Sequence, residues 1–76
     1  MNIERTILTN LNHRHPGLMA TGTLWSEVAL DETGCTYTAF KSALTELEIK
    51  GQIVVITGED RNKTKITDAG LARLAE

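Results

Sequence analysis

The stretch FKSALTELEIKGQI, residues 40–53, decides the fold of this chain. Its apolar positions recur at i, i+3, i+4 and i+7, the spacing that gathers side chains on one face of an α-helix. These positions are Phe40, Ala43, Leu44 and Leu47. Gly51 suits the C-terminal cap, because glycine adopts positive φ without steric cost, and a β-branched run opens at Ile53. The stretch therefore predicts a helix with one buried face that leads directly into a strand.

The start of this helix also has a local signal. Thr36 is the predicted N-cap, which places Cys35 just before the cap and Phe40 at the fourth helical position, the pairing of a hydrophobic staple. Cys35 is therefore interpreted as a packing residue, and a redox-sensing thiol is the alternative. A polar face repeats the helical spacing on the opposite side. It consists of Thr38, Lys41, Ser42 and Thr45.

Upstream, the apolar spacing predicts an amphipathic helix over residues 2–13, followed by a short segment over residues 18–22. A second helix is expected to begin with Thr23 as its N-cap and to end near Asp31. The polar residues and glycine of the next stretch, 31–34, indicate a turn. Three helices are therefore expected before the first strand.

Downstream, residues 52–57 and 63–67 are predicted to be two strands joined by a turn over residues 58–62. Alternation in the second strand places Thr64 and Ile66 on one face and the lysines on the other. A short C-terminal helix follows, capped by Thr67 or Asp68 and apolar on one side despite Gly70. The sequence thus predicts a two-stranded hairpin between two helices.

Composition excludes several classes of protein. The chain has 76 residues, 41% of them hydrophobic, and a formal net charge of −2, which predicts one small domain over residues 1–76. Its longest apolar run, residues 53–56, is far below the roughly 20 residues of a membrane-spanning helix. The N-terminus shows no apolar block typical of a signal peptide, and a lone cysteine forms no internal disulfide. We therefore expect a cytoplasmic protein.

The sequence gives no sign of catalytic or metal-binding chemistry. No nucleophile and base pair, glycine-rich phosphate loop or paired carboxylates stand out, so we predict a protein that is not an enzyme. His13 and His15 are too few ligands for a metal site. We expect no cofactor, metal or small-molecule ligand.

The order of elements resembles the winged helix-turn-helix domain of bacterial transcriptional regulators. The resemblance covers nearly the whole chain and rests on residues 24–29 (LWSEVA), 34–36 (GCT) and 40–53. Residues 66–71 (ITDAGL) are similar to the junction between wing and last helix in multiple-antibiotic-resistance-type repressors. The resemblance to the winged helix-turn-helix domain implies an α+β, mainly α fold. This fold has a three-helix core, a two-stranded β-hairpin wing and a short C-terminal helix.

The resemblance also implies a function, that of a small DNA-binding transcriptional regulator. A recognition helix at about residues 36–50 would enter the major groove of double-stranded DNA, and a wing at about 58–65 would touch the backbone or minor groove. The recognition face contains no arginine. The residues expected to contact DNA are Thr36, Tyr37, Thr38, Lys41, Ser42, Thr45, Arg61, Lys63 and Lys65.

The sequence is also compatible with other interpretations. The polar helix face could be an ordinary solvated surface, and lysines on a hairpin could simply discourage edge-to-edge strand pairing. Because the net charge is acidic, a winged-helix module that docks proteins and does not bind DNA is the main alternative. Trp25 is interpreted as a core residue, with a partner anchor as the alternative. A homodimer and a place in a larger assembly are both compatible with the sequence.

Overall fold

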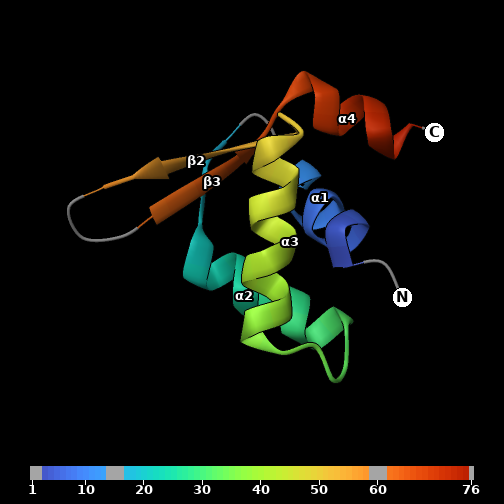
Figure 1. The fold of residues 1–76 in the computed structure, drawn as a ribbon, viewed down its shortest axis with the longest axis vertical. Helices are drawn as coiled ribbons and strands as arrows, with labels where there is room; N and C mark the ends of the chain where they lie inside the picture. Colours follow the sequence, from blue (N-terminus) through green and yellow to red (C-terminus); the bar gives the residue numbers. More distant parts are fainter. Residues whose placement is uncertain (1–2, 14–16, 59–61, 76) are drawn as a thin grey trace.

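The computed structural model describes residues 3–13, 17–58 and 62–75, and it is an α+β fold that is mainly helical (Figure 1). Along this described chain, helices and strands follow in the order α1 (Ile3–Asn12), β1 (Met19–Ala20), α2 (Thr21–Asp31), α3 (Tyr37–Ile49), β2 (Ile53–Thr57), β3 (Asn62–Ile66) and α4 (Asp68–Leu74). The predicted order of helices, strands and last helix is therefore confirmed.

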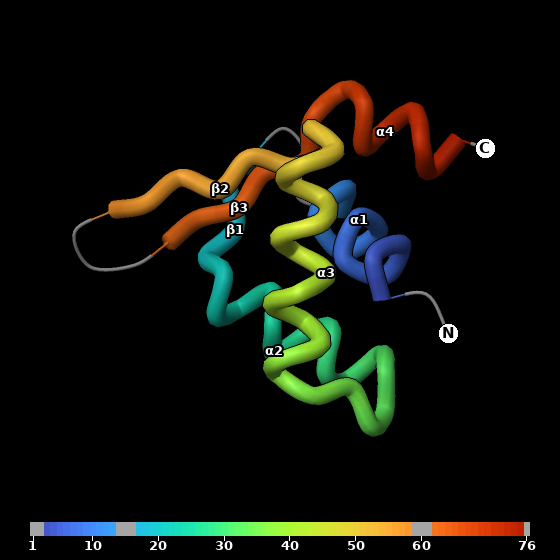
Figure 2. The backbone as a smooth tube through the Cα atoms, viewed as in Figure 1, coloured from blue at the N-terminus to red at the C-terminus, as the bar shows by residue number. Residues whose placement is uncertain are grey.

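The sheet differs from the prediction, because it has three strands instead of two. Its antiparallel order is β1-β3-β2, with Met19 opposite Thr64 and Ile53 opposite Ile66. A strand as short as β1 has no detectable alternation, and it exists only because β3 supplies the backbone partners. As Figure 2 shows, β2 and β3 project from the helices as a long hairpin, and β1 lies beside the middle of β3.

The predicted ends of α3 are confirmed by its hydrogen bonds. The Thr36 hydroxyl accepts from the Ala39 amide at 3.1 Å, as an N-cap does. At the other end Gly51 has φ +75°, its amide donates to the Glu48 carbonyl at 3.0 Å, and the next amide, Gln52, donates to Leu47 at 2.9 Å. These two bonds satisfy carbonyls that the helix end would leave open, and they turn the chain into β2.

The predicted start of α2 is wrong. The helix begins at Thr21, not after a Thr23 cap, and Ala20 holds the N-cap position without a side-chain hydrogen bond. The reason is the sheet: pairing with β3 keeps Ala20 extended, so the helix starts as soon as β1 ends. The hydroxyl groups of Thr21 and Thr64 lie 3.0 Å apart, which satisfies the fully buried Thr64.

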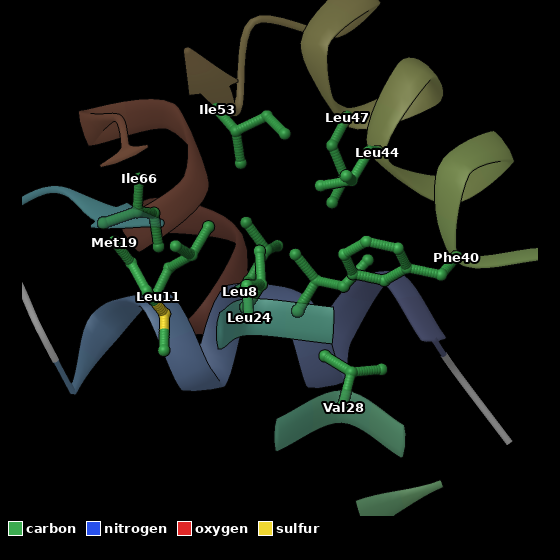
Figure 3. Packing of buried hydrophobic residues seen from close by; sticks show 11 residues of the cluster. Leu8, Leu11, Met19, Leu24, Val28, Phe40, Leu44, Leu47, Ile53 and Ile66 are labelled. Carbon is green, nitrogen blue, oxygen red and sulfur yellow. The ribbon is translucent and has the colours of Figure 1, made fainter. Parts of the chain in front are cut away.

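The core lies between the three larger helices and the inner face of the sheet (Figure 3). Phe40 from α3 points toward Val28 and Leu24 of α2, while Ile53 and Ile66 close the core from the sheet. Cys35 and Ala43 pack against this cluster and are partly buried, in line with the staple interpretation. The buried apolar residues are Ile7, Leu8, Leu11, Met19, Leu24, Val28, Phe40, Leu44, Leu47, Ile53 and Ile66.

Gly70 in α4 is a close-contact position that the sequence pattern did not reveal. A Cβ added there would collide with the Gln52 carbonyl oxygen and would lie 2.7 Å from Cγ1 of Ile66. We expect Gly70→Ala to lower the free energy of unfolding by about 1–3 kcal/mol, because backbone cannot yield as a side chain does. Denaturant unfolding at pH 7 measures this.

Gly22 provides the matched control, since it is also helical but nothing lies within 4 Å of the position that a Cβ would take. Gly22→Ala should leave stability unchanged or raise it by up to about 1 kcal/mol, through the smaller backbone entropy of alanine. Equal effects of the two substitutions would show that the close contact at Gly70 does not limit stability.

A charged cluster joins both ends of the described chain. Glu4 on α1 accepts hydrogen bonds from Arg73 of α4 at 2.6 Å and from Lys50, the C-cap of α3, at 3.1 Å. Arg73 also donates to the Gln52 side chain at 2.8 Å. The Arg73 hydrogen bond lowers the pKa of Glu4, partial burial opposes this, and Lys50 lowers the pKa further.

The lowered pKa makes part of the stability depend on pH. Glu4 holds its proton less tightly in the folded than in the unfolded state, so its contribution is complete above the unfolded pKa and is lost as pH falls through the lower folded value. Glu4→Gln should cost about 1 kcal/mol at neutral pH and nearly nothing in acid. Glu48→Gln, at an exposed position, is the control. A pH-independent cost for Glu4→Gln would contradict the ion-pair account.

Candidate nucleic-acid interface

The predicted polar face of α3 lies on the surface. Thr38, Lys41, Ser42 and Thr45 are all exposed, whereas Phe40, Leu44 and Leu47 on the other side are buried. The 13-residue helix therefore presents a polar stripe from Thr38 to Thr45. The exposed stripe and its N-terminal amides are both able to meet an anionic surface.

The hydroxyl groups on this helix are not equivalent. Those of Thr36 and Thr45 bind the helix's own backbone: Thr36 accepts from Ala39, and Thr45 donates to the Lys41 carbonyl at 3.0 Å. The side-chain hydroxyls of Thr38 and Ser42 have no hydrogen-bond partner among the described residues. Thr38, Ser42 and the Lys41 ammonium are therefore donors that no bond within the described fold uses, and the Thr36 hydroxyl, which accepts from Ala39, still has its own proton to donate.

Tyr37, the first residue of α3, is held by aromatic packing. Its ring centroid lies 5.5 Å from that of Trp25 in an edge-on arrangement and 6.1 Å from that of Phe40. Trp25 is 5.2 Å from Phe40 and packs against the core, as its core interpretation predicts. Tyr37 nevertheless remains 53% exposed, so a rigid ring stands at the edge of the polar stripe.

The hairpin presents its lysines on the outer face of the sheet. Thr64 and Ile66 point into the core, Lys63 is exposed and Lys65 is partly exposed, which confirms the predicted alternation. The edge-protection interpretation of these lysines is wrong, because β3 is the central strand of the sheet. Arg61, the third predicted wing residue, lies outside the described residues.

A chain of contacts connects the hairpin to α3. Lys63 of β3 is the strand partner of Ala20, the last residue of β1 and the N-cap of α2. Trp25 follows in α2, five residues after Ala20, and its ring contacts that of Tyr37 in α3. Ala20 also lines a shallow hollow of about 340 Å³ at the start of α2, together with Gly22, Thr23 and Ser26. The start of α2 therefore lies between the hairpin and the first turn of α3, and the sequence prediction did not include this α2 segment.

The cations of the described residues fall into two groups. Lys50 and Arg73 are ion-paired with Glu4, and Arg5 donates to the carbonyl of Leu74 at 3.1 Å, so these three hold the fold together. The second group is Lys41, Lys63 and Lys65, which make no ion pair within the described part of the chain. All three belong to the α3 stripe or the outer face of the hairpin.

Two of the acidic side chains, Asp31 and Glu32, lie at the opposite end of α2 from Ala20, the strand partner of Lys63. Asn10 of α1 donates to Asp31 at 3.0 Å and Thr6 donates to Glu32 at 2.5 Å. These carboxylates line a shallow hollow of about 380 Å³ between α1 and the end of α2. Because they are already bound by α1, this hollow serves the packing of two helices. The acidic cluster is thus held at the far end of α2, away from Lys63.

Two other kinds of functional feature are absent from the described residues. These residues contain no group of three His, Cys, Asp or Glu side chains that could hold a metal ion. None of the described helices has the length and apolar character needed to cross a membrane. Comparison with family models, curated proteins and solved structures finds no match to the chain.

Proposed function

We propose that this protein is a winged helix-turn-helix protein that binds duplex DNA and acts as a small transcriptional regulator. In this proposal α3 lies in the major groove, and the β2–β3 hairpin is the wing on the backbone or minor groove. The observation that carries it is the position of the unpaired cations. Lys41 lies on the exposed stripe of α3, and Lys63 and Lys65 lie on the outer face of the hairpin, while Lys50, Arg73 and Arg5 bind groups within the fold.

The chemistry of this surface suits a phosphate backbone. Each lysine that neutralises a phosphate releases condensed counterions, which gives affinity that is independent of sequence and sensitive to salt. Thr38 and Ser42 add hydroxyl donors that the fold does not consume. Phosphate contacts fix the position of the protein on the duplex, and contacts in the groove then distinguish bases.

A second candidate function is docking to another protein, and one feature favours it. The edge strand β2 exposes Val54 and Ile56, each 45% accessible, on the same outer face as Lys63 and Lys65. Together with Lys65 and Asp68, these apolar residues line a hollow of about 360 Å³. A docking module that uses this face would need no affinity for DNA.

A residue-resolved NMR titration separates the two functions. Isotope-labelled protein is titrated with a mixed-sequence duplex at low salt and again near physiological ionic strength. DNA binding predicts shifts in the recognition helix, residues 36–50, and in the hairpin at residues 61–65, that weaken with salt, with α4 unaffected as an internal control. The absence of shifts at low salt would reject the DNA proposal and direct the search to protein partners of the β2 face.

A further inference from the structure

The exposed face of α3 does not stay polar along its whole length. Thr38, Ser42, Thr45 and Ile49 follow one another at i, i+4, i+7 and i+11 and so share one side of the helix. Ile49 stands directly opposite the buried face and is 74% exposed. The Ile49 side chain therefore has no role in the core, and it lies on the face of α3 that we propose to bind DNA.

Thr45 belongs to the same apolar end. Because its hydroxyl donates its proton to the Lys41 carbonyl, Thr45 can offer a base its methyl group and an accepting oxygen but no hydrogen-bond donor. The C-terminal half of the stripe therefore offers the Thr45 methyl and the Ile49 side chain. The neighbouring carboxylates of Glu46 and Glu48 would repel the phosphates of the DNA backbone. Thr45 and Ile49 would therefore contact the edges of the bases.

We propose that Thr45 and Ile49 contact the 5-methyl group of thymine in the major groove, and this inference rests on the DNA-binding function proposed above. The thymine methyl is the apolar group that base pairs display in that groove, and threonine methyl and aliphatic side chains pack against it. The face has no arginine, asparagine or glutamine for paired hydrogen bonds with purines. Thymine-containing sites are therefore preferred through apolar contact.

The test compares one mixed-sequence duplex with the same duplex in which uracil replaces every thymine, which removes only the methyl groups. Binding is measured by fluorescence anisotropy at low salt. We expect the unmodified duplex to bind about fourfold more tightly for each contacted methyl, the gain from burying one such group. Thr45→Ser, which keeps the hydroxyl and loses the methyl, and Ile49→Ala should each reduce the ratio of the two affinities.

Leu30→Ala is the control, because Leu30 is 82% exposed but lies at the end of α2, outside the proposed interface. It should leave the ratio of affinities unchanged. Equal binding of the two duplexes by the unmodified protein would overturn methyl recognition and leave DNA binding intact. An unchanged ratio in both α3 variants would overturn the assignment to these residues. Failure to bind either duplex would reject the proposed function itself.

Discussion

Phe40→Ala is expected to lower the free energy of unfolding by about 3–5 kcal/mol, the usual cost of truncating a buried aromatic side chain. Phe40 is completely buried, points from α3 toward α2, and packs its ring against Trp25. A chain of this length has only about 4–11 kcal/mol of stability in total. The substitution therefore removes a large part of it, as urea unfolding followed by circular dichroism would show.

Tyr37→Ala is the matched control, since Tyr37 belongs to the same aromatic cluster but is half exposed. Its expected cost is about 1 kcal/mol, because less apolar area leaves water on folding. If Phe40→Ala does not fold, Phe40→Leu gives a measurable intermediate value. A loss of less than about 1 kcal/mol for Phe40→Ala would mean that the packing of α3 on α2 does not depend on this ring.

The double substitution Lys63→Ala and Lys65→Ala should weaken DNA binding by about 10²-fold at low salt, if each lysine neutralises one phosphate. The loss should be similar for all duplex sequences, and the slope of log affinity against log salt should become shallower by about 2. Both lysines stand on the outer face of the central strand without an ion pair among the described residues. Anisotropy titrations over a range of salt concentrations measure both quantities.

A control must remove the same charge elsewhere. Arg73→Ala serves for a single substitution such as Lys63→Ala, because Arg73 pairs with Glu4 and lies on α4, outside the proposed interface. It should leave the salt slope unchanged, whereas Lys63→Ala should reduce its magnitude by about 1. Equal slopes for the two variants would show that only net charge matters and that the hairpin makes no direct phosphate contact.

Much of the fold could be predicted because its signals are local. Thr36 caps α3 as predicted, Gly51 ends it at positive φ directly after the Lys50 C-cap, and Thr67 is the one of the two expected residues that caps α4. The alternation of buried and exposed side chains along β3, with Thr64 buried, follows from the two-residue period of a strand alone. Such signals are present in any window of a few residues, whatever the rest of the chain does.

The features that were missed depend on residues far apart in sequence. β1 exists through its pairing with β3, and this pairing also displaces the start of α2 from the expected Thr23 cap. Gly70 looks like a weak point of α4 until Gln52 and Ile66 are placed against it. Likewise, the exposed stripe of α3 follows from spacing, but the commitment of the Thr45 hydroxyl to the backbone appears only in three dimensions.

The central place of β3 in the sheet has a consequence for synthesis on the ribosome. β3 is the last strand to be made, and until it emerges neither β1 nor β2 has a strand to pair with. The α-helices can form early, but the core stays open on the side that Ile66 closes. A stalled chain would expose the unpaired, β-branched strand β2, which makes nascent chains of this protein prone to aggregation at that stage.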